Sequence, residues 1–322
     1  MKFSYLTYLA STACLVSAGS GPAQSQSFPN KPIRIVTSEA GGGNDYSARL
    51  IAIALAGNVG QSVIVDNRGG GSGVIAVDIV SKAPPDGYTI LFQSNGLWTL
   101  PFIQPVPYDI VKDLAPLTLS GSTPTLLVVH PSVPVKSVKD MISLAKSKNS
   151  ELNCGTAATG SATHLALELF KSMAGVNITR VAYKGSGPAV IDLIGGQVQL
   201  MFAVVSSVTQ QVKAGRLRAI AITTAQPSAL APDLPTVAAS GLPGFESAST
   251  QGLWAPAKTP ATLITRLNQE LVRVINRADV KEKFFAAGVD VVGSTPQRFA
   301  AYIKSDMAVV GKLVKEAGIK AD

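Results

Sequence analysis

The sequence has few of the residues from which catalytic and metal centres are built. It contains two cysteines and two histidines in 322 residues. No Cys or His pair shows metal-ligand spacing, and the G-x-S-x-G, H-E-x-x-H and G-x-x-x-x-G-K-[ST] patterns are missing from it. The sequence therefore predicts no zinc site, nucleophile elbow or P-loop, and we expect neither a metal nor a cofactor.

Aromatic residues and basic clusters are also scarce. Aromatic residues make up 6% of the chain, and its net charge of +8 is spread along the sequence without a basic block. Surfaces that bind nucleic acid combine a basic stripe with aromatic side chains, so we expect no nucleic-acid partner. After the N-terminal segment, no apolar run approaches the roughly 20 residues of a membrane-spanning helix. A dispersed positive charge instead favours weak steering of anionic solutes.

Residues 1–26 have the pattern of a secretory signal peptide. Lys2 gives the positive start, a mostly apolar stretch runs to Val16, and small residues suitable for cleavage follow. This pattern predicts export to the periplasm. A lipoprotein anchor at Cys14 is the alternative, although the leucine-like residue expected three positions earlier is missing. Cleavage would leave only Cys154, which excludes an internal disulfide and which we expect to be a small buried side chain.

The remaining chain alternates short apolar strands with helices. A hydrophobic content of 46% is enough for two domains with proper cores. Repeated strand–turn–helix units predict a mostly parallel sheet, and ligands of such sheets collect at the carboxyl ends of the strands. The proline-rich residues 101–124 are predicted to be a crossover between lobes, followed by a strand over Leu126–Val129.

A glycine-rich turn connects the first strand to the first helix. The strand over residues 33–36 is followed by Gly41-Gly42-Gly43-Asn44-Asp45 and then by apolar residues at helical spacing. Glycines permit close approach of a ligand, and a helix N-terminus favours an anion. We expect Asn44 or Asp45 to cap the helix. The alternative is that the three glycines form only a tight turn.

A second turn of the same kind favours a ligand site. Residues 152–170 run from a short strand through Gly155, Thr156, Thr159 and Gly160 into a helix, with Ser161 as the expected cap. One helix terminus contributes about 0.3–1 kcal/mol, and up to about 2 when it is partly buried. Micromolar binding needs roughly 8 kcal/mol. We therefore expect two lobes to face one ligand, with Ser94 and Asn95 joining from a third polar strand end.

Two enzyme interpretations can be derived from the sequence. Gly71-Ser72-Gly73-Val74-Ile75-Ala76 matches a dinucleotide-binding fingerprint, but it follows the second strand and opens a short helix. A hydrolase could use Ser161 and His164, with Asp45 of the other lobe as an orienting carboxylate. We favour a binding module without turnover over both.

The mature chain resembles, from residue 28 to 320, the solute-binding receptors of tripartite tricarboxylate transporters, the Bug-type extracytoplasmic receptors. The resemblance lies in the combination of many short motifs. These are Phe28-Pro29-Asn30-Lys31-Pro32-Ile33-Arg34, Gly41-Gly42-Gly43-Asn44-Asp45, Val65-Asp66-Asn67-Arg68, Pro85-Asp86-Gly87-Tyr88-Thr89, Tyr108-Asp109, Lys112-Asp113, Gly160-Ser161 with His164, Tyr183-Lys184-Gly185, Gly195-Gly196-Gln197-Val198, Ala214-Gly215-Arg216-Leu217-Arg218-Ala219, Pro235-Thr236-Val237 and Gly241-Leu242-Pro243-Gly244-Phe245.

The resemblance implies an α/β, two-lobed periplasmic binding protein of the type II-like class. Each lobe would hold a mixed, mostly parallel sheet flanked by helices, with a cleft between the lobes. Residues 27–124 and 251–322 would form lobe 1, and residues 125–250 lobe 2. The protein would be a monomer that captures a small organic acid and delivers it to transporter membrane subunits. A sensor subunit for a membrane kinase is the alternative.

The expected ligand-binding residues combine the strand-end interpretation with the resemblance. They are Ser38, Glu39, Gly42, Gly43, Asn44, Asp45, Ser94, Asn95, Thr156, Thr159, Gly160, Ser161 and Ala203. Two positions depart from the family pattern. Glu39 stands in a stretch that is usually rich in proline, and Ala203 stands where some relatives carry an aspartate that suits amino-acid ligands. We therefore expect a monocarboxylate or an aromatic or aliphatic acid, with Glu39 reading a polar or cationic end.

Overall fold

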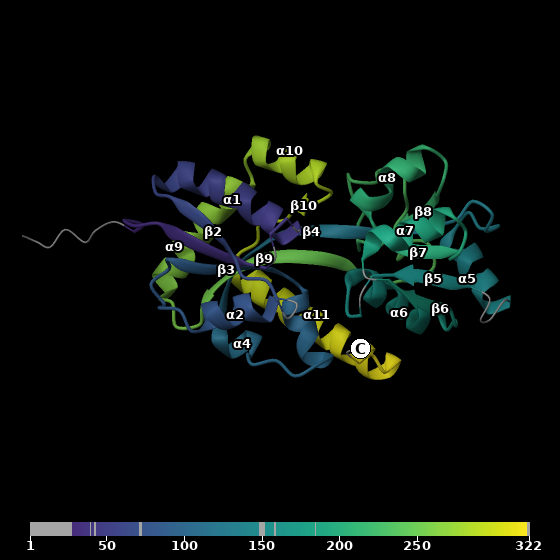
Figure 1. The fold of residues 1–322 in the computed structure, drawn as a ribbon, viewed down its shortest axis with the longest axis horizontal. Helices are drawn as coiled ribbons and strands as arrows, with labels where there is room; N and C mark the ends of the chain where they lie inside the picture. Colours follow the sequence, from purple (N-terminus) through teal and green to yellow (C-terminus); the bar gives the residue numbers. More distant parts are fainter. Residues whose placement is uncertain are drawn as a thin grey trace, which may run out of the picture.

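The computed structural model describes residues 28–38, 40–41, 43–70, 73–147, 152–157, 159–183 and 185–320. The chain forms two lobes that lie side by side and are joined by two long strands (Figure 1). These linking strands are β4 (Leu114–Val129) and β9 (Ala248–Pro256), which pair with each other in antiparallel fashion. The expected two-lobed α/β class is confirmed.

Lobe 1 contains the N-terminal strands and the C-terminal helices. Its strands carry apolar residues that become fully buried, as in β1, where Ile33, Ile35 and Val36 are inaccessible to solvent. Its elements are β1 (Ile33–Thr37), α1 (Gly43–Val59), β2 (Val63–Asn67), α2 (Val74–Ser81), β3 (Thr89–Ser94), α3 (Gly96–Thr99), η2 (Leu100–Phe102), α4 (Ile110–Asp113), α9 (Ala261–Ile275), α10 (Ala278–Ala286), β10 (Asp290–Val291) and α11 (Pro296–Ala317).

Lobe 2 repeats the strand–helix alternation around its own core. Phe170, Phe202 and Phe245 pack against one another there, with ring centroids 5.5–6.4 Å apart. Its elements are α5 (Val138–Ser147), β5 (Asn153–Thr156), α6 (Ala162–Ala174), β6 (Thr179–Ala182), α7 (Ser186–Ile194), β7 (Leu200–Val204), α8 (Val205–Lys213) and β8 (Arg218–Ile222). Cys154 is fully buried in this core, as predicted, and burial raises the pKa of its thiol to about 12.

The strands follow the order β2-β1-β3-β9-β4-β7-β5-β6, and β8 and β10 also pair with β4. β1 is parallel to β2 and β3, and β5 is parallel to β6 and β7. Three antiparallel pairings separate these two parallel sets, namely β3 with β9, β9 with β4 and β4 with β7. The two sets therefore run in opposite directions, and their carboxyl ends face each other across the junction of the lobes.

The predicted crossover over residues 101–124 is wrong for its second half. β4 begins at Leu114, and its first part pairs with β9 while residues 125–129 pair with β7 and β8. Prolines usually interrupt central strands. Here the register shifts between Pro116 and Thr118, and Pro124 lies where the pairing changes from one lobe to the other. The prolines therefore occupy irregular positions of a strand that is otherwise continuous.

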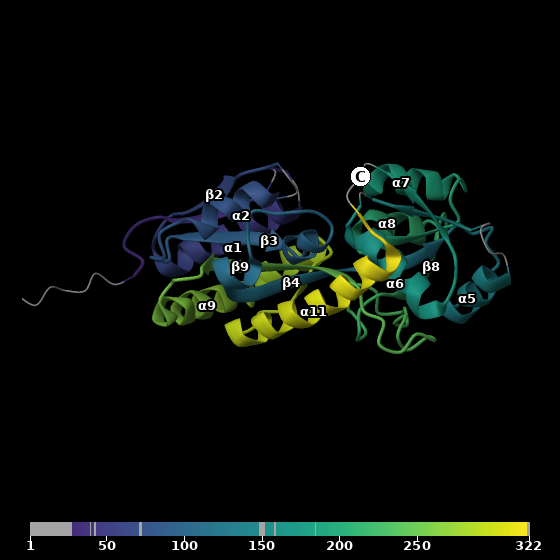
Figure 2. The same cartoon turned by 90° about the horizontal axis from the view of Figure 1, so that it is seen from below.

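Helix α11 packs against both lobes. Phe299 and Ile303 belong to a lobe 1 cluster with Trp98 and Trp254. Farther along the helix, Val310, Leu313 and Val314 cluster with Leu165 of α6 in lobe 2. Figure 2 shows the helix crossing from one lobe to the other. The predicted boundaries at 124/125 and 250/251 stay a prediction, but the packing of α11 connects the C-terminal part to lobe 2 as well.

Candidate functional site

The first glycine turn is held by a buried carboxylate. Oδ2 of Asp45 accepts a hydrogen bond of 2.8 Å from the amide of Gly41, whose φ of 80° suits glycine. Its Oδ1 accepts from Nδ2 of Asn67 at 2.9 Å and lies 2.8 Å from Nε of Arg49. Burial opposes ionisation of Asp45, but these hydrogen bonds outweigh it and lower its pKa. Asp45 therefore holds the first glycine turn in place through these hydrogen bonds.

The expected capping by Asn44 or Asp45 is wrong, because α1 already begins at Gly43 and both residues lie inside its first turn. The side chain of Asn44 instead joins the ends of two strands, β1 and β3. Its Nδ2 donates to Oγ of Ser38 at 3.2 Å and to Oε1 of Gln93 at 2.8 Å. This placement leaves the amides of the first turn of α1 unoccupied by a side-chain cap from either residue.

A cavity of about 420 Å³, which we call the strand-end cavity, opens at this turn between the two lobes. Its lining consists of hydroxyl, amide and small apolar groups, and none of the described residues that line it carries a charge. These residues are Ser38, Gly43, Asn44, Tyr46, Ser47, Ser94, Thr123, Val204, Ser206, Ser249, Gln251, Ala287 and Val289. Its volume lies within the range of small-molecule sites.

Two helix N-termini face the strand-end cavity from opposite lobes. Gly43 and Asn44 begin α1, and Val204 and Ser206 lie at the start of α8, whose first helical residue is Val205. The first amides of each helix have no partner within the helix, and each terminus carries about half a positive charge. The cavity thus offers polarised donors on both sides without a cationic side chain.

The second glycine turn lies elsewhere on the junction. Ser161 caps α6, as predicted, by accepting from the amide of His164 at 3.3 Å. Arg180 donates from Nε to Oγ1 of Thr156 at 3.0 Å and from a terminal nitrogen to Oγ1 of Thr159 at 2.9 Å. A Cβ added to Gly160 would come within 2.6 Å of Ile103 in lobe 1. This turn therefore touches lobe 1 at Ile103, and its residues do not line the strand-end cavity.

The structure brings together only some of the expected site residues. Ser38, Gly43, Asn44 and Ser94 line the strand-end cavity. Thr156, Thr159, Gly160 and Ser161 belong to the second turn, Asp45 lies behind the first turn, and Asn95 lines a different cavity. Ala203 is fully buried in the lobe 2 core, while the next residue, Val204, reaches the cavity. Glu39 and Gly42 lie outside the described residues.

Several residues that line the strand-end cavity were not predicted from the sequence. Thr123, Ser249 and Gln251 come from the linking strands, and nothing in their local sequence distinguishes them from other strand residues. Ser206 could have been found, because it lies just after the carboxyl end of β7, much as Ser94 forms the carboxyl end of β3. Arg180 was missed because it lies inside a strand, although it is the cation that holds the second turn.

Two lobes whose parallel strand ends face a polar cavity define the class of two-lobed solute-binding receptors. Residues 47–319 match the model of the tripartite tricarboxylate transporter family receptor, so the chain belongs to this family. Protein BugT of Bordetella pertussis is 34% identical over 314 residues, which cover 95% of each chain. Receptors of this family are periplasmic and bind carboxylates in cooperation with transporter subunits.

Solved structures with similar folds include two with bound ligands. Rpa4515 of R. palustris with adipate is 37% identical, with a TM-score of 0.76, over 92% of this chain and 100% of that one. MatC of Rhodopseudomonas palustris with bound malate is 28% identical, with a TM-score of 0.71, over 89% of this chain and 100% of that one. Both neighbours were solved with aliphatic dicarboxylates.

Proposed function

We propose that this protein captures a small aliphatic carboxylate in the strand-end cavity and delivers it to the membrane subunits of a tripartite tricarboxylate transporter. The observation that carries the proposal is the meeting of the α1 and α8 N-termini at one uncharged cavity between the lobes. A carboxylate is stabilised there by backbone amides and hydroxyl groups, and no acidic side chain among the described lining residues opposes it.

The ligand is an aliphatic acid of about the size of adipate or malate. Rpa4515 and MatC support this class through the ligands with which they were solved. Because each lobe carries one helix N-terminus, closure of the two lobes would stabilise a second carboxylate on the same ligand. Arg180, which holds the second turn, adds positive charge to the lobe 2 side of the junction.

The location we propose is the periplasm, reached through the signal peptide over residues 1–26, which lie outside the described residues. No helix in the described part of the chain is long and apolar enough to cross a membrane. We further propose that the protein acts as a monomer and without nucleic acid. The dispersed basic residues and the low aromatic content support this view.

We propose that the protein has no catalytic turnover. Oγ of Ser161 accepts from the backbone amide of His164 and shares a hydrogen bond of 3.1 Å with Thr163, as expected of a helix cap. The imidazole of His164 accepts at Nδ1 from the amide of Gly160 at 3.1 Å. Nε2 of the same ring lies 3.8 Å from Oε1 of Glu168. These contacts support structural roles for both side chains and give a Ser–His nucleophile no support.

Calorimetry with adipate, malate, hexanoate and citrate tests the proposal on wild-type protein and on Gly43→Val. A Cβ at Gly43 meets no atom within 4 Å, so the valine projects into open space and obstructs the ligand. We expect binding of at least one of the smaller acids, and its loss in Gly43→Val without a change in melting temperature. Gly57→Val, farther along α1 and equally unobstructed, is the matched control. Retained affinity in Gly43→Val, or citrate as the tightest ligand, would overturn the proposal.

A further inference from the structure

A second cavity, of about 320 Å³, lies on the other side of the linking strands. Successive side chains of β9 point to opposite faces of the sheet. Ser249 and Gln251 therefore line the strand-end cavity, whereas Ala248 lines the second cavity on the other face. We call the second space the hinge cavity. It is lined by Asn95, Ala162, Leu165, Leu169, Met173, Gly244, Glu246, Ser247, Ala248, Tyr302, Ser305, Asp306, Val309, Val310 and Leu313.

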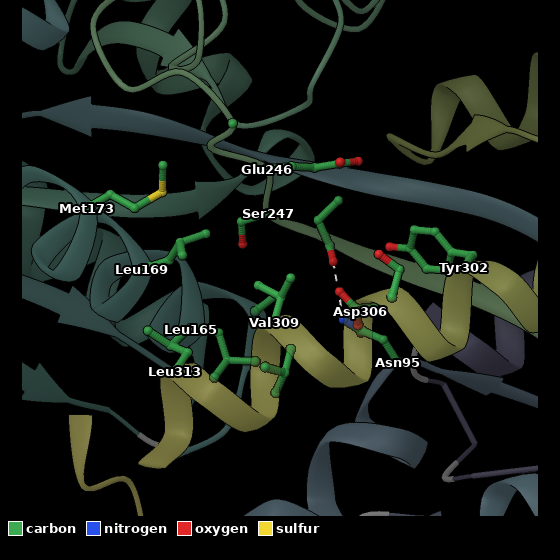
Figure 3. Close-up of a pocket in the computed structure, with 15 residues that line it drawn as sticks. Asn95, Leu165, Leu169, Met173, Glu246, Ser247, Tyr302, Asp306, Val309 and Leu313 are labelled. Carbon is green, nitrogen blue, oxygen red and sulfur yellow. Dashed lines mark hydrogen bonds between the residues drawn. The ribbon is translucent and has the colours of Figure 1, made fainter. Parts of the chain in front are cut away.

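One end of the hinge cavity is apolar and open to solvent. Leu165, Leu169 and Met173 of α6 face Val309 and Leu313 of α11 across it (Figure 3). Met173 and Val309 stay 37% and 50% exposed. Exposed apolar side chains around a concavity are typical of a surface that another apolar group covers. This end therefore suits an alkyl chain.

The other end is acidic and has no cation of its own. Asp306 is half-buried on α11, and Glu246 stands at the rim, on the segment that leads into β9. Nε1 of Trp98 donates to Oδ2 of Asp306 at 2.5 Å, and the described residues supply no donor to Oδ1. Neither carboxyl has a Lys, Arg or His of the described chain within ion-pair distance. Two unpaired acids thus border the cavity from elements of different lobes.

The electrostatics of these acids favour a cationic partner. Burial raises the pKa of Asp306, and burial together with the charge of Asp306 raises that of Glu246. A raised carboxyl pKa means that the ionised form is disfavoured where it stands. A nearby ammonium group would favour the ionised form of both carboxyls. Glu270, by contrast, is a buried acid that pairs with Arg266 and Arg273.

We propose that the hinge cavity is a second binding site, for a primary ammonium compound that carries a short alkyl chain. The ammonium group pairs with Asp306, Glu246 at the rim adds negative charge, and Tyr302 and Ser305 offer hydroxyl acceptors at the same end. The chain runs between α6 and α11 toward Met173. A volume of about 320 Å³ is at the small end of ligand pockets, which limits the compound to a short chain.

This site is chemically distinct from the strand-end cavity, which lies on the opposite face of β9 and favours anions. Its occupant touches both lobes, because α11 is anchored in the lobe 1 core while α6 belongs to lobe 2. Binding there would favour one relative position of the lobes. By linkage, the carboxylate and the ammonium compound would then change each other's affinity by the same factor.

The test is calorimetric titration of the full chain with n-hexylammonium chloride, 1-hexanol and sodium hexanoate at pH 7.5. We expect hexylammonium to bind at the hinge cavity at least tenfold more tightly than hexanol. Asp306→Asn combined with Glu246→Gln should weaken hexylammonium at least tenfold, while Glu316→Gln, an exposed acid on the same helix, should leave it unchanged. Val309→Trp, at an exposed position, should block the apolar end with both acids intact.

Gly43→Val separates this proposal from the carboxylate site. We expect it to bind hexylammonium as the wild type does, whatever happens to its carboxylate affinity. The proposal is overturned if hexylammonium does not bind, if hexanol binds equally tightly, or if the double variant keeps full affinity. It is also overturned if Gly43→Val abolishes hexylammonium binding, since that would place the compound in the strand-end cavity.

Discussion

The Nδ2 atom of Asn44 donates a 2.8 Å hydrogen bond to Oε1 of Gln93, which ties the first turn of α1 to the end of β3. The same amide reaches Ser38 at the end of β1, so one side chain organises two strand ends at the rim of the strand-end cavity. Gln93 lies 49 residues from Asn44 in sequence, whereas Ser38 lies only 6 residues away. The position of the first helix turn over the cavity therefore depends on a tertiary contact.

Asn44→Ala should weaken carboxylate binding about tenfold, which corresponds to about 1.4 kcal/mol. The substitution removes two hydrogen bonds and releases Gln93, so the lining is no longer held in place. Calorimetry with the tightest acid found for the wild type measures the effect. Asn276→Ala serves as the control, because that exposed side chain bonds only within its own helix at Val272. Equal affinities of Asn44→Ala and the wild type would contradict the role assigned to Asn44.

Asp45→Asn should lower the free energy of unfolding at pH 7 by about 1 to 3 kcal/mol, as expected for hydrogen bonds to a charged group. The folded-state pKa of Asp45 is lowered, so its contribution is present above the unfolded pKa of about 3.9 and is lost as the pH falls through the folded value. The free energies of unfolding of the wild type and the variant should therefore converge under acidic conditions. Urea unfolding at pH 7 and at pH 3 measures the difference, and a gap that does not narrow in acid would show that Asp45 acts through packing alone.

Asp306→Asn should have the opposite pH dependence. The folded-state pKa of Asp306 is raised, so ionisation costs stability as the pH rises from the unfolded pKa through the folded one. Asparagine removes this cost and keeps an oxygen acceptor for Trp98. We expect the variant to gain stability relative to the wild type between pH 4 and pH 8, measured by thermal unfolding across that range. Glu316→Gln, whose carboxyl is exposed, should show no such trend.

Gly252→Ala should destabilise the protein by about 1 to 3 kcal/mol, the usual cost of overpacking. A Cβ at this position of β9 would come within 2.3 Å of Cζ of the buried Phe299 and 3.0 Å of the carbonyl oxygen of Thr118. Phe299 anchors α11 to lobe 1, so displacement of its ring should also disturb the contact of α11 with α6. Gly57→Ala, on the exposed side of α1, is the matched control. Chemical denaturation of both variants checks the difference, and equal stabilities would show that the ring moves aside without cost.

The sequence by itself determined the order of strands and helices, the polar turns at the strand ends, the Ser161 cap, the buried Cys154 and the family. These features follow from local periodicity, from the chemistry of capping and from motifs that are contiguous in the chain. Ser38, Gly43, Asn44 and Ser94 were found because carboxyl ends of parallel strands gather polar residues. Such reasoning finds a candidate wherever a strand ends in a polar turn.

Only the tertiary structure decided which of these turns share a cavity. The three antiparallel pairings between β3 and β7 reverse the direction of the second strand set, and this reversal depends on the continuous course of β4 through its prolines. Thr123, Ser249 and Gln251 enter the strand-end cavity because of their register in the linking strands, and Asn95 faces the hinge cavity instead. Pairing register and the reach of α11 across to α6 are long-range contacts, so no local pattern could specify them.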